Sequence, residues 1–223
     1  MEGAQTMSKT KDIRTAVEDE LIFDPLVDSS DIHVENIDGS VALNGTVPSY
    51  PQYLEAETAT RRVAGVTGVH NHLEVVLPSG DERDDALLTT AANNALELDV
   101  TIPDTVEASA HNGNITLAGT VLYGYQRTAA ESRVASLTGA RNVKDEIEIS
   151  WDADPVDVTI AVKDALDRNA LVPDDSDVVV DTDGNTVTLT GHVRTWAEHD
   201  AVIDAAWMTP AVYDVYDRLV ISR

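Results

Sequence analysis

The sequence has no cysteine, only four lysines among its 223 residues, and few aromatic side chains. Without cysteine, disulfides and thiolate metal sites are excluded, although the redox compartment stays open. No apolar run approaches the roughly 18 residues of a membrane-spanning helix. The polar N-terminus has no apolar stretch before a small-residue cleavage site, so we expect a cytoplasmic protein that is not exported.

Positive charge is also scarce, because 40 acidic residues face 15 basic ones and the net charge is -25. Repulsion among so many negative charges weakens a compact fold in ordinary salt. Molar salt shortens the Debye length to about 3 Å and screens this repulsion. The composition therefore favours a protein of a halophile, and an ordinary acidic protein is the alternative. Nucleic acid is not an expected partner, since its phosphates need a basic face.

A strand motif occurs three times along the chain. Its form is Val/Ile-x-Leu-x-Gly-x-Val, with the glycine at Gly45, Gly119 and Gly191. A second strand, Val-x-Asn/Asp-x-Leu/Ile-x-Val/Ile, follows each time at the same distance. The first copy maps onto the second at an offset of 74 residues, and the second onto the third at 72 from Gly119 onward. Solenoid repeats are about 20 to 50 residues long, so each longer copy is predicted to be a domain with its own core.

Each copy is predicted to have the order helix, strand, strand, helix, strand. Apolar residues at helical spacing open each copy, and two alternating strands follow, joined by Asp38-Gly39, Asn112-Gly113 or Asp183-Gly184. The second helices are expected near 50–64, 123–137 and 195–208. The predicted domains are residues 12–77, 84–150 and 155–223, with short linkers between them.

The predicted fold class is α+β, with three tandem domains. In each domain, strands one and two should pair antiparallel, and strands two and three should run parallel because a helix connects them. The two helices are expected to cover one face of this mixed three-stranded sheet. Whether strand three lies beside strand one or strand two is open. The recurring glycines, Gly45, Gly119 and Gly191, are interpreted as structural, allowing a close helix approach or a strand bulge on the core face.

The glycine strand and the strand that follows the second helix resemble the BON domain. The segments Gly65 to Leu73 (GVTGVHNHL) and Gly139 to Ile147 (GARNVKDEI) carry this resemblance best. It covers the chain from about Asp12. The resemblance implies a non-enzymatic, transport-associated module that binds phospholipid surfaces or envelope partners, often in osmotic or general stress. Because anionic headgroups would repel a charge of -25, we expect no association with anionic vesicles at ordinary ionic strength.

No constellation of side chains points to catalysis, and no cofactor is expected. His70 and His72 share one strand face and could be two metal ligands, but two solvated histidines are the simpler interpretation, so no metal site is predicted. The Asp-rich segment 172–177 lacks the spacing of a calcium loop. Nucleotide-binding and nucleophile-elbow motifs are absent. A metal-dependent hydrolase is therefore the least favoured function.

Aromatic residues cluster where the second helix of each copy begins. They are candidates for a contact surface toward a partner, or for packing that caps the sheet: Tyr50, Tyr53, Tyr123, Tyr125 and Trp196. The sequence thus predicts a stress-associated binding protein that engages a macromolecular partner or a membrane surface. Phospholipid binding in the manner of the family is the alternative.

Overall fold

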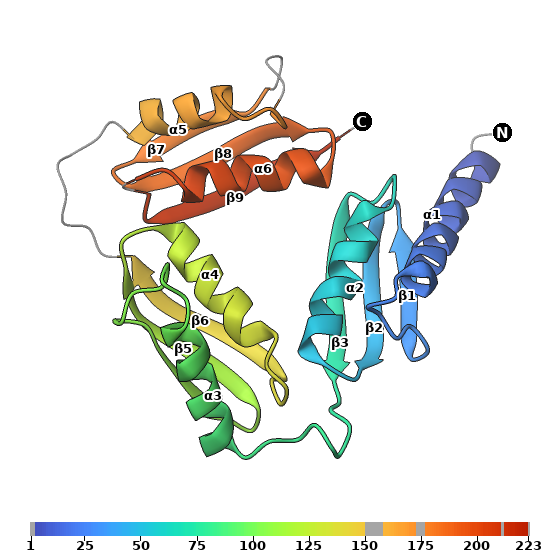
Figure 1. The fold of residues 1–223 in the computed structure, drawn as a ribbon. Coiled ribbons are helices and arrows are strands. Elements are labelled where there is room, and N and C mark those ends of the chain that lie inside the picture. The colour runs from blue at the N-terminus through green and yellow to red at the C-terminus, as the bar shows by residue number, and fades with distance from the viewer. Residues whose placement is uncertain (1–2, 150–157, 173–176, 211, 223) are drawn as a thin grey trace. The chain divides into compact units, whose positions relative to one another are not determined.

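A computed structural model describes residues 3–149, 158–172, 177–210 and 212–222, and repeats one α-β-β-α-β unit three times (Figure 1). The first copy consists of α1 (Gly3–Phe23), β1 (Ile32–Ile37), β2 (Ser40–Val47), α2 (Tyr50–Arg62) and β3 (Gly68–Val75). The second consists of α3 (Asp85–Glu97), β4 (Glu107–His111), β5 (Asn114–Val121), α4 (Gly124–Ala135) and β6 (Asn142–Ile149). The third consists of α5 (Val158–Asp167), β7 (Val179–Asp183), β8 (Thr186–Val193), α6 (Trp196–Trp207) and β9 (Asp214–Ile221). The predicted α+β class and tandem organisation are confirmed.

Each sheet has three strands, and the second strand of the copy lies in the middle, in the orders β1-β2-β3, β4-β5-β6 and β7-β8-β9. In the first and third copies the first two strands pair antiparallel, as predicted, with Val34 opposite Leu43 and Val180 opposite Leu189. The last two strands of these copies pair parallel. The structure thus answers the question that the sequence left open, because strand three lies beside strand two.

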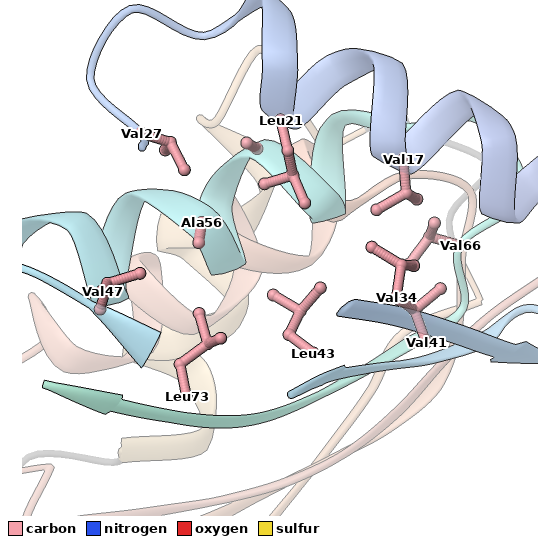
Figure 2. Packing of buried hydrophobic residues seen from close by; sticks show 11 residues of the cluster. Val17, Leu21, Val27, Val34, Val41, Leu43, Val47, Ala56, Val66 and Leu73 are labelled. Atoms are coloured by element: carbon pink, nitrogen blue, oxygen red, sulfur yellow. The ribbon is translucent and has the colours of Figure 1, made fainter. Parts of the chain in front are cut away.

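Both helices of a copy lie on one face of its sheet (Figure 1). In the first and third copies the buried hydrophobic cluster joins residues of the helices and of the sheet. In the first copy, Val17 and Leu21 of α1 point toward Leu43 of β2 and Leu73 of β3 (Figure 2). In the third copy the corresponding cluster contains buried residues of both helices and of the sheet: Val158, Val162, Leu166, Val180, Val187, Leu189, Val202 and Ala206. Burying a side chain of this size stabilises a fold by about 1.5 to 3 kcal/mol. The alternating strand pattern and the helical stripe place these side chains on the faces that pack together.

The recurring glycines have a backbone reason. Gly45, Gly119 and Gly191 have φ values of +121°, +135° and +118°, which side-chain-bearing residues rarely adopt. A Cβ at these positions would lie 1.9 to 2.2 Å from the backbone carbonyl oxygen of a residue one or two positions before the first strand: Asp31, Thr105 or Asp177. The close approach is therefore between neighbouring strands, and no helix atom is among the nearest contacts.

The Asn/Asp of the last strand also recurs for a physical reason. Oδ1 of Asn71, Asp145 and Asp217 accepts a hydrogen bond from the backbone N–H two residues later, at 3.2, 2.8 and 3.0 Å. The same three residues contact equivalent side chains of the second helix. Tyr53 Oη donates to the Asn71 carbonyl at 3.4 Å, Arg127 pairs with Asp145 at 3.0 Å, and His199 Nε2 lies 2.8 Å from Asp217 Oδ2. This position therefore ties the second helix to the last strand in every copy.

Candidate functional site: the groove between the helices of the third copy

A turn at the end of the first helix gives the three copies a common reference point. Asp24, Asp99 and Asn169 each accept a hydrogen bond through Oδ1 from the backbone N–H two residues later, at 2.9, 3.0 and 3.0 Å. Their backbone carbonyls also accept from the N–H three residues later, at 3.2, 3.0 and 3.0 Å. Because these turns match, the grooves between the two helices can be compared position by position.

In the first copy an arginine fills this groove. Arg62, the last residue of α2, donates from Nε to Glu20 of α1 at 3.0 Å, from one terminal nitrogen to Glu55 of α2 at 3.0 Å, and from the other to Asp24. The Leu26 backbone N–H and the Arg62 guanidinium hold the pKa of the Asp24 carboxyl below its usual range. The three carboxylates in turn raise the pKa of Arg62. The two helices are thus linked by one cation that is shared among three anions.

The second copy has a smaller version of this arrangement. Arg133, which lies at the position of Ala59 in the first copy, donates from Nε to Asp99 at 2.5 Å. The Thr101 hydroxyl and backbone N–H, with this arginine, lower the pKa of Asp99 to about 2. An ion pair from Arg133 therefore bridges the helices of the second copy, whereas Arg62 of the first copy makes two such pairs, with Glu20 and Asp24.

The third copy has none of these charges in the corresponding places. The turn aligns the first helices, and the offsets of 74 and 72 residues align the second helices. On this alignment the residues that replace Glu20, Asp24, Glu55 and Arg62 are Ala165, Asn169, Ala201 and Met208. Asn169 Nδ2 donates to the Ala201 carbonyl at 3.2 Å and links the two helices without charge.

A groove with a volume of about 650 Å³ lies between α5 and α6, where the third copy lacks the charged side chains of the first. Its walls include the small side chains of Ala161, Ala165 and Ala205, and Met208 lies in it with 67% of its surface exposed. The charged lining residues are Asp164, Arg168 and Asp204. Burial, and then the neighbouring Asp200 carboxylate, raise the pKa of Asp204. The groove therefore combines an apolar surface with acidic groups.

The aromatic residues considered for a contact surface or for capping the sheet form local pairs. Tyr50 stacks on Tyr53 with ring centroids 5.6 Å apart, and Tyr123 stacks on Tyr125 at the same distance. Tyr50 is buried, whereas Tyr125 is 39% exposed. The Trp196 ring meets His199 edge-on at 4.9 Å.

His199, which the sequence analysis did not single out, lies between two carboxylates. Its Nδ1 is 3.0 Å from Asp200 Oδ1, and its Nε2 contacts Asp217 as described above. His199 could have been found by aligning the copies, because it takes the position of Arg127 in the second copy. The Arg127 side chain also pairs with an aspartate of the last strand.

The two histidines considered as metal ligands, His70 and His72, are exposed on β3 with their rings nearly parallel and 6.4 Å apart. Within the part of the chain that the structure describes, no group of three or more potential ligands is placed to hold a metal ion. The Asp-rich segment lies mainly in residues 173–176, outside the described residues.

The BON domain profile matches the sequence three times, over residues 9–76, 84–150 and 156–223. The chain belongs to the BON domain family. BON domains bind phospholipids or are associated with stress, and the family is generally non-enzymatic. The resemblance predicted from the two strand motifs is thus confirmed.

Two solved structures of CdsD, a structural protein of the type III secretion system of Chlamydia trachomatis, are also similar to the chain. Its C-terminal domain is 14% identical, with 95% of this chain and 98% of that chain covered and a TM-score of 0.26. The second structure is 13% identical, with 95% and 92% covered and the same TM-score. No curated protein matches the sequence. Among the described helices, none is long and apolar enough to cross a bilayer.

Proposed function

We propose that this protein is a non-enzymatic binding protein in which the groove between α5 and α6 of the third BON domain receives a partner macromolecule. The observation that carries the proposal is the difference between the copies. The groove is filled by Arg62 and three carboxylates in the first copy and is open, with a volume of about 650 Å³, in the third. Ligand sites are typically concave, with apolar walls and a few polar groups, and this groove has both features.

A protein partner is favoured over a membrane surface by charge. Each lysine or arginine near an anionic leaflet contributes about 1 kcal/mol to binding, and a polybasic cluster is what such surfaces select. The groove has one lining arginine, Arg168, beside Asp164 and Asp204, and the chain carries -25 overall. Phospholipid binding is supported by family membership alone and is the alternative.

The composition supports a setting for this function. Since aspartate and glutamate greatly outnumber lysine and arginine, the proposed environment is the salt-rich cytoplasm of a halophile, where screening permits so much like charge on a compact protein. Within that environment, we propose a role in the stress response, in keeping with the family.

Affinity capture from cells that contain the protein naturally, at their own salt concentration, tests the proposal. Three baits are compared: the unchanged protein, a filled-groove variant with Ala165→Glu and Met208→Arg, and the control Met208→Leu, which keeps the groove apolar. The proposal expects a partner that the unchanged protein and the control retain and the filled-groove variant loses. Circular dichroism establishes that all three baits are folded. Equal capture by all three would place the binding surface elsewhere.

Vesicle flotation tests the alternative. Vesicles of phosphatidylglycerol and phosphatidylcholine are mixed with the full chain at ordinary and at molar potassium chloride. The proposal expects no flotation at ordinary ionic strength and weak flotation at most in molar salt. If the protein floats tightly at low salt and loses binding when Tyr50, Tyr53, Tyr123, Tyr125 and Trp196 are replaced by alanine, the lipid function is retained and the proposal is wrong.

A further inference from the structure

We propose that the groove between α5 and α6 binds an arginine or lysine side chain from a basic segment of a partner protein, between the helices that correspond to those that Arg62 links in the first copy. The inference rests on the proposed function and goes beyond it by naming the chemistry of the occupant. It follows from the filled grooves of the first two copies, from the charges that line the open one, and from its small apolar side chains.

The first and second copies show that this groove accommodates a guanidinium group. Arg62 reaches carboxylates on both sides of the groove, with Glu20 on α1 and Glu55 on α2 each at 3.0 Å. Arg133 spans the equivalent helices of the second copy to meet Asp99 at 2.5 Å. An arginine of the second helix that reaches across to the first is thus a recurrent arrangement, and the third copy has Ala205 and Met208 at the two arginine positions while keeping the same backbone turn.

Unpaired acidic groups line the open groove. Asp164 lies on α5 and Asp204 on α6, and neither has an ion-pair partner among the described residues. Burial and the Asp200 carboxylate raise the pKa of Asp204, which means that its charged form lacks compensation. A cation entering between the helices would supply that compensation, because Arg168 alone leaves the two aspartates and one arginine of the lining with an excess of negative charge.

The apolar walls suit the stem of a basic side chain. Lysine and arginine bury their methylene groups against apolar surface while the charged end meets acceptors. Ala161, Ala165 and Ala205 leave room for such a stem, and Met208, with a flexible thioether side chain, can pack against it. An acidic segment would gain this packing but would meet Asp164 and Asp204 as like charges.

The net charge of the chain favours the same partner. A charge of -25 attracts basic proteins and repels a second copy of itself, so self-association through this groove is disfavoured. Salt screens the long-range attraction but acts less on a contact in a partly buried groove. Binding should therefore weaken with salt and persist at molar potassium chloride.

NMR titration of the full chain with N-acetyl-arginine amide tests the inference directly. The expected result is saturable shifts of backbone amides around Ala165, Asn169 and Ala205, with no matching shifts around Glu20 and Arg62 in the first copy. The filled-groove variant, Ala165→Glu with Met208→Arg, should bind at least tenfold more weakly, whereas Met208→Leu should bind within about twofold of the unchanged protein. Replacing Asp164 and Asp204 by asparagine should also weaken binding.

N-acetyl-norleucine amide, which has a similar stem without the charge, is the matched control ligand. Equal shifts with both ligands, or none with the arginine amide, would overturn the inference. Flotation with phosphatidylglycerol vesicles that is lost in the filled-groove variant would also overturn it, in favour of a lipid. If affinity capture returned a partner that the filled-groove variant loses, the proposed function would still be supported after this inference had failed. The two failures can therefore be told apart.

Discussion

The first and third copies share a scaffold and differ in what lies between their helices. Both have the same strand order, the same pairing directions and a glycine with φ near +120° in the middle strand. Between the helices, the first copy has Arg62 among three carboxylates, whereas the third has alanines, an asparagine and Met208.

This difference shows that the fold and the groove depend on separate residues. Core positions keep their apolar character in both copies because a lost side chain leaves a cavity. In the groove, Arg62, Glu20 and Glu55 are partly exposed, so their ion pairs contribute little to stability and can be exchanged for small or uncharged side chains. The groove of one copy can thus change while all three copies keep the same fold.

The first prediction has the largest expected effect and concerns the glycine in the middle strand of each copy, a backbone feature that all three copies share. Replacing Gly45, Gly119 or Gly191 by alanine should lower the free energy of unfolding by about 2 kcal/mol or more. The reasons are the positive φ, which strains a residue with a side chain by about 1 to 3 kcal/mol, and the overlap of Cβ with a carbonyl oxygen, as in overpacking. Urea unfolding followed by circular dichroism measures it.

Gly80→Ala is the control, since a Cβ at Gly80 would meet nothing within 4 Å. It should leave the unfolding curve unchanged. If the three strand glycines tolerated alanine as well as Gly80 does, the middle strands would not share a backbone that requires glycine.

The second prediction concerns the filled groove. Arg62→Met gives the first copy the residue that the third copy has, but leaves Glu20, Asp24 and Glu55 close together without a cation. The melting temperature should fall by roughly a few degrees, because these pairs are partly exposed and such a network is worth little more than about 1 kcal/mol. The reverse change, Met208→Arg, should not lower it. Differential scanning calorimetry compares the two, and a fall of equal size for both would contradict the comparison.

Salt should reduce the effect of Arg62→Met. Raising potassium chloride from low to molar concentration is expected to stabilise the unchanged protein by screening its like charges. The variant should gain more than the unchanged protein, because repulsion among its three unpaired carboxylates is screened as well. Melting curves across salt concentrations provide the measurement, and a flat curve for the unchanged protein would argue against a halophilic origin.

Lowering the pH should destabilise the first two copies before the third, and this is the smallest of the expected effects. The pKa of Asp99 is lowered to about 2 and that of Asp24 is also lowered, so their stabilising contributions are present above pH 4 and are lost as the pH falls toward 2. Asn169 does not titrate, and the raised pKa of Asp204 means that a penalty at neutral pH is relieved on acidification. Hydrogen exchange followed by mass spectrometry should show protection between pH 5 and 2.5 falling first in copies one and two. Loss beginning in the third copy would contradict this ordering.

Much of the fold could be predicted from the sequence because it depends on periodicity. Alternating residues around Leu43, Leu117 and Leu189 indicate strands with one buried face, and a helix between two strands requires a parallel pair. The position of the third strand could not be predicted, since either neighbour satisfies the same pattern. The role of the glycines was predicted only in part, because a contact with the carbonyl of Asp31 depends on the strand register.

The groove was harder to predict. Arg62 is separated from Glu20 by 42 residues, and no motif connects them. A signal existed once the copies were aligned, because the position of Arg62 becomes Met208 in the third copy. What the alignment alone could not show is that Glu20, Asp24 and Glu55 converge on that position, which requires the packing of one helix on the other.

The aspartate and asparagine side chains on the last strands have one more consequence. β3, β6 and β9 lie at the outer positions of their sheets, where an unpaired N–H could recruit a strand from another copy. By occupying the N–H of Leu73, Ile147 and Leu219, these side chains remove a hydrogen-bond donor from each open edge. A chain with three closely related domains is at particular risk of exchanging strands between them while it folds. The recurring Asn/Asp therefore helps each domain to fold with its own strands.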